Sequence, residues 1–369
     1  MMISDRDGSN LYFYNPHDDK IETIPHSGGS FSASNLYSTA SGRYVAIVNG
    51  ANHDVRFYDS GYEAHDDHAH KKGSPKFGKV IGSVGKKPTH YKSHKDHIIV
   101  FNDEEGTISY FKESEIHTAT APNIINKGQK EHHGAFDIFD NGNIAVTVKA
   151  TVNPVSGTLP ELVRIINTSG SMVHDTVLRT GGIHGSACNG SSALFGCTQG
   201  VLRVNSDGTQ KIISNPSYFG TRWLGTLLFG KDSKKFYGLR NGFGLFEINI
   251  ESETITPVDT AASFRTAAYD WEGHYLYTLH VDGTVKKINT KTGAILKQKV
   301  VNVSFPTTGS AGMPRMVGTS KYLYITDGIN GDLVILDNKD LREVKRKRLA
   351  GKAQSMAFLG FDGADDHSH

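Results

Sequence analysis

The feature of this sequence that most constrains its fold is an internal repeat of roughly 40 to 50 residues. Each copy reads as four short strands separated by turns. In the clearest copy, the strands are expected at residues 265–269, 275–279, 285–288 and 294–297. The turns between them, such as Val281-Asp282-Gly283, carry the Gly and Asp that tight hairpins require. Because this period and strand content are typical of propeller blades, we predict an all-β fold, a β-propeller.

The number of blades follows from how the copies are distributed. Seven copies are complete, and they begin near Ser34, Pro88, His133, His184, Trp223, Arg265 and Pro314. Residues 353–359 read as an innermost strand without successors, and residues 2–4, 11–14 and 21–24 read as later strands without a first one. Joining the N- and C-terminal strands in one blade would remove the exposed sheet edges of an open propeller. We therefore predict eight four-stranded blades, with seven as the alternative.

Two segments interrupt the repeat. Residues 62–79 follow the third strand of one blade and include a run rich in His and Asp. Residues 151–161 form a Pro- and Gly-containing excursion that reads as an ordinary surface loop. Since nothing else in the chain reads as a linker, we expect residues 1–369 to form a single domain with a His- and Asp-rich loop inserted at 62–79.

Composition argues against some partners. The near-balance of 40 basic and 38 acidic residues gives no reason to expect nucleic acid as a partner. The longest apolar runs, such as residues 98–101, are far shorter than the ~20 residues that cross a bilayer, so no membrane insertion is expected. Residues 1–6 show no basic segment followed by an apolar one, so no secretory signal is visible. We expect either a cytosolic protein or a mature chain from which a signal has been removed.

Three histidines occupy equivalent places in consecutive copies of the repeat. His90, His133 and His184 fall at the starts of innermost strands, and in a propeller the loops leading into these strands converge on one face. Zinc binds imidazole nitrogens and carboxylate oxygens in a tetrahedral shell. Asp103 lies in the loop between the second and third strands of the His90 blade and should open on the same face. We therefore predict a zinc site formed by these histidines and Asp103.

This prediction depends on the strand register. A single histidine at a strand start is usually a rim residue that bonds to a neighbouring loop, but three at equivalent positions favour a shared metal site. If the register is shifted by one residue, His132 or His280 would replace one of the three.

The inserted loop gives a separate metal-binding signal. It places five potential ligands within six residues: His65, Asp66, Asp67, His68 and His70. Short His-rich tracts bind metal with modest selectivity, and a solvated charged loop is the alternative. We predict that this loop is a secondary metal site.

The two cysteines, Cys188 and Cys197, lie nine residues apart across the turn-like segment Asn189-Gly190-Ser191-Ser192. If they face each other on adjacent strands, their separation suits a disulfide, which would indicate an oxidising compartment. Two buried thiols are the alternative. We predict the disulfide.

Enzymatic motifs are scarce. The sequence has no Gly-x-Ser-x-Gly and no phosphate-binding loop, and its Gly pairs do not lead from a strand into a helix. We therefore predict that the protein is not an enzyme. One rival is a zinc-dependent hydrolase or lactonase with a general base such as Glu131, since an incomplete three-histidine shell is also a hydrolytic arrangement. A propeller that binds proteins without metal is the other rival.

As a set, several short segments resemble the AztD-like family, the periplasmic zinc metallochaperones of zinc ABC transporters. These segments are Pro88-Thr89-His90, Phe101-Asn102-Asp103, His132-His133-Gly134, His184-Gly185 with Cys188 and Cys197, Gly312-Met313-Pro314, and the Asp- and His-rich loop after Asp59-Ser60-Gly61. The resemblance covers the whole chain and implies a propeller that holds Zn²⁺ and passes it to the transporter's solute-binding protein. It implies site roles for His90, His133 and His184. We accordingly predict a monomeric, periplasmic zinc carrier.

Overall fold

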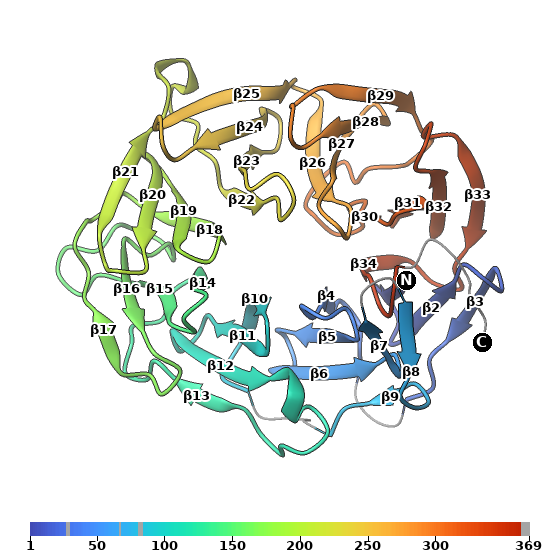
Figure 1. The fold of residues 1–369 in the computed structure, drawn as a ribbon, viewed down its shortest axis with the longest axis horizontal. Coiled ribbons are helices and arrows are strands. Elements are labelled where there is room, and N and C mark those ends of the chain that lie inside the picture. The colour runs from blue at the N-terminus through green and yellow to red at the C-terminus, as the bar shows by residue number, and fades with distance from the viewer. Residues whose placement is uncertain (27–29, 66–67, 80–83, 363–369) are drawn as a thin grey trace. The chain divides into compact units, whose positions relative to one another are not determined.

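The computed structural model describes residues 1–26, 30–65, 68–79 and 84–362. Within these residues, the chain forms eight four-stranded sheets and one two-stranded hairpin (Figure 1). The fold is an all-β, eight-bladed β-propeller, as predicted. In the same part of the chain, no helix is both long enough and apolar enough to cross a membrane.

The chain divides into two compact units. Unit 2 comprises Ser83–Glu115 and Ala119–Thr266 and contains four of the sheets. In chain order these are β10 (Pro88–His94), β11 (His97–Asn102), β12 (Thr107–Lys112) and β13 (Asn123–Ile125); β14 (Phe136–Ile138), β15 (Ile144–Val148), β16 (Leu162–Ile166) and β17 (Met172–His174); β18 (Ile183–Cys188), β19 (Ser192–Cys197), β20 (Gly200–Asn205) and β21 (Gln210–Ser214); and β22 (Thr226–Phe229), β23 (Phe236–Arg240), β24 (Gly244–Asn249) and β25 (Thr254–Thr260). The short 3-10 helices are η1 (Glu113–Glu115) and η2 (Ser217–Phe219).

Unit 1 comprises Met1–Gly82, Ile116–Thr118 and Ala267–His369. Its sheets are formed by β1 (Met2–Asp5), β2 (Leu11–Asn15), β3 (Lys20–Thr23) and β34 (Ala353–Ala357); β4 (Asn35–Ser38), β5 (Tyr44–Asn49), β6 (Asp54–Asp59) and β9 (Lys76–Phe77); β26 (Phe264–Tyr269), β27 (Tyr275–His280), β28 (Thr284–Asn289) and β29 (Ile295–Val300); and β30 (Met316–Gly318), β31 (Tyr322–Asp327), β32 (Asp332–Asp337) and β33 (Glu343–Arg348). Strand β26 begins at the end of unit 2 and finishes in unit 1.

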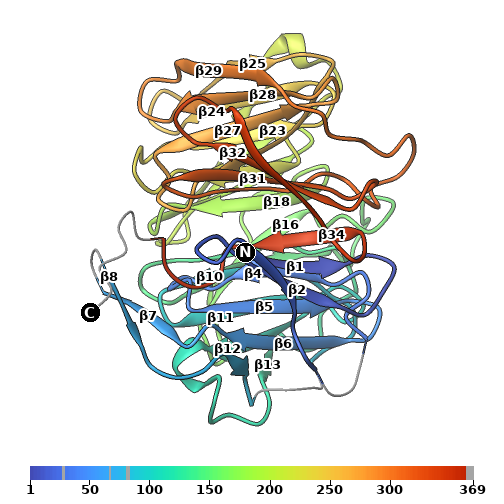
Figure 2. The same cartoon turned by 90° about the vertical axis from the view of Figure 1, so that its right-hand side faces the viewer.

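One sheet of unit 1 joins the two ends of the chain. Its strand order is β3-β2-β1-β34, so the C-terminal strand is hydrogen-bonded to the N-terminal one (Figure 2). The strands are antiparallel, and Ile3 lies opposite Met356. The predicted shared blade is confirmed, which gives eight blades and not seven.

The core lies between successive sheets. All six residues of β5 and of β19 are buried, and strands covered on both faces carry such continuous apolar runs. In unit 2, Phe101 of β11 and Phe136 of β14 belong to one buried cluster, with ring centroids 6.3 Å apart. This packing between sheets sets the positions of the first strands, which carry the candidate site.

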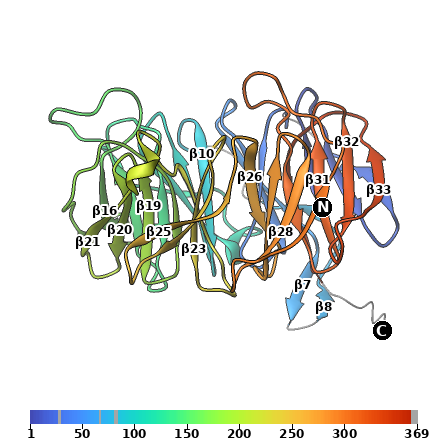
Figure 3. The ribbon, with the colours of Figure 1, turned by 90° about the horizontal axis from the view of Figure 1, so that it is seen from above.

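The inserted segment contains a hairpin of its own. Strands β7 (Tyr62–His65) and β8 (His68–Lys71) pair with each other, between β6 and β9 in the chain. The hairpin projects away from the other strands of unit 1 (Figure 3). At its root, the buried carboxylate of Asp59 accepts hydrogen bonds from Arg43 and from the Gly61 amide, and it contacts His117.

The predicted disulfide is wrong, because both cysteines are free. In the β18–β19 hairpin, Cys188 pairs with Ala193, while Cys197 pairs with Ile183 at the other end. With a strand rise of roughly 3.4 Å per residue, Cys197 lies on the order of 13 Å along β19 from the position opposite Cys188. A disulfide needs Cα atoms within about 7 Å. The sequence spacing was compatible with a hairpin but did not determine its register.

Candidate metal centre

The candidate site lies in unit 2, on or just before the first strands of three successive sheets. Strand β10 lies beside β14, and β14 lies beside β18. His90 is in β10, His184 is in β18, and His133 is in the segment that leads into β14. Packing of these strands therefore brings together histidines that are more than forty residues apart in sequence.

Two of the histidines sit at irregularities in their strands. In β10, the pairing register shifts between Pro88 and Tyr91, on either side of His90. In β18, an equivalent shift follows Ile183 and includes His184. Such β-bulges place one extra residue in a strand and redirect its side chain, and they are common beside functional sites. The bulges thus turn both imidazoles out of the regular alternation of their strands.

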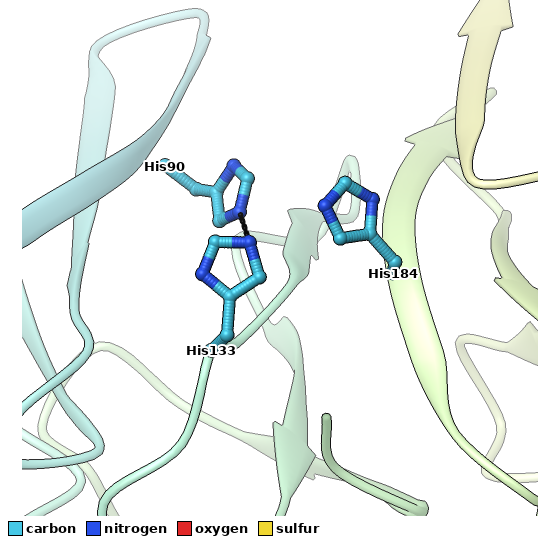
Figure 4. A group of neighbouring side chains, drawn as sticks. All are labelled: His90, His133 and His184. Atoms are coloured by element: carbon cyan, nitrogen blue, oxygen red, sulfur yellow. Dashed lines mark hydrogen bonds between the residues drawn. The ribbon is translucent and has the colours of Figure 1, made fainter. Parts of the chain in front are cut away.

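The three imidazoles form one compact group. Their ligand nitrogens all lie within 4.8 Å of one another, and Figure 4 shows the rings directed toward one another. The Nε2 atoms of His90 and His133 are 3.0 Å apart. Two nitrogens bound to one zinc ion at ~2.0 Å would lie roughly 3.3 Å apart in a tetrahedral shell. The group therefore needs only small side-chain movements to hold one ion.

Hydrogen bonds on the far side of two rings determine which nitrogen faces the group. The Nδ1 atom of His133 lies 2.7 Å from Asp103 Oδ2. In the same way, Nδ1 of His184 lies 2.6 Å from the carbonyl oxygen of Gly225. In each neutral ring, Nδ1–H donates to the oxygen, so Nε2 keeps its lone pair. Metal-binding histidines almost always have a partner of this kind.

Asp103 lies behind His133. It is 8% exposed and follows β11, in the loop where the sequence placed it. The group of mutually close ligand atoms contains only the three histidines among the described residues. Within the same residues, Asp103 Oδ1 has no hydrogen-bond partner. The contacts therefore support an orienting role for this carboxylate, and its predicted role as a ligand stays a prediction.

The environment keeps two of the imidazoles neutral. Burial, followed by the proximity of His133 and His184, lowers the pKa of His90 to about 3. Burial also lowers the pKa of His184, although the hydrogen bond to Gly225 opposes this shift. Because a metal binds the neutral imidazole, these two residues need not first lose the extra proton of an imidazolium.

Neither substitute histidine lies in the group. His132 is 2% exposed, and its ring nitrogens contact the carbonyl oxygens of Lys130 and Thr147. It is a core residue with both nitrogens occupied. His280, at the end of β27, belongs to unit 1. The group therefore contains His90, His133 and His184 without the one-residue shift of strand register that would have brought in His132 or His280.

Residues 151–161 are more than a surface loop. The carbonyl oxygen of Thr158 accepts a hydrogen bond from the backbone amide of His133, and the Pro160 carbonyl accepts one from Ile183, which precedes His184. At the ends of this loop, Lys149 and Glu161 form an ion pair at 3.3 Å, with side chains 4% and 0% exposed. The segment thus supports the backbone beside two of the three histidines, a role that its composition did not reveal.

The His-rich hairpin is described only in part. Asp66 and Asp67 lie outside the described residues, as do the side chains of His65 and His68. His70 is exposed on β8, opposite Glu63. An ion pair between Glu63 and Lys72 spans the hairpin at 3.2 Å.

The fold and the site define a class: an eight-bladed propeller with a three-histidine group on, or leading into, adjacent first strands. No family model matches the chain. The chain is 24% identical to the zinc chaperone AztD of Citrobacter koseri, over 95% of this chain and 87% of that protein. It is therefore a homologue of AztD, as the sequence motifs indicated.

Solved structures of AztD from the same organism have the same fold. The crystal structure superposes with a TM-score of 0.85 at 21% identity, covering 99% of this chain and 98% of that one. The apo structure gives a TM-score of 0.83 at 20% identity and covers 96% of each chain.

Proposed function

We propose that this chain is a zinc carrier that binds one Zn²⁺ through His90, His133 and His184 and delivers it to the solute-binding protein of a zinc ABC transporter. The observation that carries the proposal is the group of three histidine nitrogens within 4.8 Å of one another. Homology to a zinc chaperone supports the choice of cargo and of a carrier role. The resemblance to that family supports the proposed partner and periplasmic location, and we propose a monomer.

The ligand set suits reversible binding. Three imidazoles fill three of the four positions that zinc usually offers, and water is available for the fourth, which Asp103 would reach only by giving up its hydrogen bond to His133. The side chain of His133 is 26% exposed, and all three histidines are only partly buried. A partner's ligand can therefore enter the shell before the carrier's ligands leave, which is how ligand exchange avoids releasing the ion into water.

The hairpin formed by β7 and β8 is the proposed secondary site. The described strands of this hairpin project from unit 1 (Figure 3), and the sequence of the inserted loop contains the proposed ligands His65, Asp66, Asp67, His68 and His70. Fixing exposed side chains around a metal costs rotamer freedom. Histidines on packed strands avoid that cost, so the hairpin is suited to capture and the strand site to tight binding.

Zinc-dependent hydrolysis is the second candidate function, because a three-histidine shell with an open position also activates water. The sequence offers Glu131 as the general base, and its side chain is exposed one residue before His132. Turnover of lactones or esters by the zinc-loaded protein would favour this function over the carrier.

Single alanine variants of the three histidines test the proposal. Each should weaken zinc binding by more than the 10- to 100-fold that loss of an outer hydrogen-bond partner costs. His94→Ala is a matched control, because His94 is on the same strand but pairs with Asp140. Competition titration with a chromophoric chelator gives the affinity, and transfer to the purified solute-binding protein gives the carrier activity. Parent-like binding by any of the three variants would remove that residue from the site.

A further inference from the structure

One ammonium group contacts both of the other strands of the site. Lys92 follows His90 by two residues on β10. Its Nζ atom donates a hydrogen bond to the carbonyl oxygen of Ser186 on β18, at 2.7 Å. The same atom lies 3.2 Å from Asp137 Oδ2 on β14. A single side chain of the His90 strand thus reaches the strand of His184 and the strand that follows His133.

A second hydrogen bond completes this connection. The hydroxyl of Ser186 donates to the backbone carbonyl of Phe136 at 2.7 Å, and this bond is buried. It joins β18 directly to β14. Together with the contacts of Lys92, it links all three histidine-bearing segments at one level, a few residues along each strand from the metal ligands.

The charges at this level are balanced. The side chain of Asp137 is only 10% exposed, whereas that of Lys92 is 34% exposed. An isolated ammonium near the histidines would repel a dication, and a buried carboxylate without a partner would be costly. Because the two neutralise each other, the pair can connect the strands without adding net charge beside the zinc ligands.

We propose that Lys92 is a positioning residue for the metal site. It holds the segments that carry His90, His133 and His184 at the spacing that one tetrahedral ion requires. This inference rests on the proposed zinc binding. The histidines come from three different sheets, so their spacing depends on how those sheets are fixed to one another. A metal shell tolerates errors of only about 0.5 Å before affinity falls.

The test compares Lys92→Met with Lys92→Arg and the parent chain. Methionine keeps the aliphatic length but removes the donor, and arginine restores a cation with several donors. We expect Lys92→Met to lower zinc affinity by about 10- to 100-fold, as for other outer supports of metal ligands. Lys92→Arg should stay within a few-fold of the parent. Lys95→Met is the matched control, because Lys95 directly follows the same strand and forms its ion pair with Asp140, at 3.0 Å.

Cobalt gives a readout that a loss of stability alone would not change. With Co²⁺ in place of zinc, the absorption bands report the coordination geometry, which we expect to change in Lys92→Met but not in Lys92→Arg or Lys95→Met. Should Lys92→Met fail to fold, Asp137→Asn removes the same ion pair and should show the same spectral change.

The outcomes separate the two proposals. A folded Lys92→Met with parental zinc affinity and cobalt spectrum would overturn the positioning role and leave zinc binding intact. If His133→Ala binds zinc as tightly as the parent chain, the proposed site itself is wrong.

Discussion

The Nδ1 atom of His184 donates a hydrogen bond to the carbonyl oxygen of Gly225, 2.6 Å away. The space around this hydrogen bond is limited by the residue after His184. Gly185 has a φ of +69°, and a Cβ at this position would lie 2.4 Å from the same carbonyl oxygen. The orientation of His184 therefore depends on the absence of a side chain at its neighbour.

Gly185→Ala should weaken zinc binding by about 10- to 100-fold, because it displaces the outer partner of His184. Gly225→Ala is the control, since a Cβ there would have no neighbour closer than 3.8 Å. Chelator competition on both variants checks the prediction. If Gly185→Ala binds zinc as tightly as the parent chain and Gly225→Ala do, the Gly225 carbonyl does not orient the ligand.

Asp103→Asn should reduce zinc affinity by roughly 10-fold. An amide oxygen can still accept the hydrogen bond from His133 Nδ1, but without the negative charge that makes the imidazole a stronger donor to the metal. The measurement is a zinc titration of Asp103→Asn and of His133→Ala under the same conditions. If Asp103→Asn loses as much affinity as His133→Ala, the carboxylate is itself a ligand, as the sequence predicted.

Zinc binding should resist mild acid. An unperturbed histidine site loses affinity below its pKa of about 6.5, because protons compete with the metal. The pKa of His90 is lowered to about 3, by burial and by its neighbouring histidines. Because the pKa values of His90 and His184 are lowered, we expect the affinity to fall less between pH 7.5 and pH 6 than at a site of unperturbed histidines. A tenfold loss of affinity across that interval would show that the site is not protected from protons.

The same shift should make metal-free stability depend on pH. The unfolded chain protonates His90 near pH 6.5, whereas the folded chain does so only near its lowered pKa, about 3. The unfolding free energy should therefore be highest above pH 6.5 and fall as the pH drops toward 3. Urea unfolding of the parent and of His90→Ala gives the contribution of this residue, and the variant should show a shallower decline.

Glu161→Gln should destabilise the fold by about 3 kcal/mol, since it removes one partner of a buried ion pair. The ammonium of Lys149 would keep its hydrogen bonds to the carbonyl oxygens of Val155 and Leu159 but would lose its anionic partner. Because the adjoining loop bonds to the backbone of His133, zinc affinity should fall as well. Denaturant unfolding and chelator competition measure the two effects. Unchanged stability would mean that the pair contributes nothing to the loop.

Deleting residues 63–72 should lower the number of zinc ions bound at high metal and slow delivery to the solute-binding protein. The tightest dissociation constant should stay almost unchanged, because the strand histidines are held by their own sheets. A variant with His65, His68 and His70 replaced by Ser separates loss of ligands from loss of the hairpin. Calorimetry that showed loss of the tight phase would make the hairpin the primary site.

Local patterns in the sequence were sufficient to predict the blades. Alternating apolar residues and turn residues recur in every copy of the repeat, so the strand at Tyr275–His280 and its neighbours could be located within a residue or two. The unmatched strands at the two ends predicted the sheet in which Ile3 lies opposite Met356. The equivalent positions of His90, His133 and His184 also followed from the repeat.

Register and contacts between sheets could not be obtained in this way. The pairing of Cys188 with Ala193 excluded the disulfide, and only packing placed Asp103 behind His133 and Lys92 against Ser186. Strand propensity and turn chemistry act over a few neighbouring residues, so they are visible in sequence. The β-bulges, the carbonyl of Gly225 and the ammonium of Lys92 depend on how separate sheets pack, which only the tertiary structure decides.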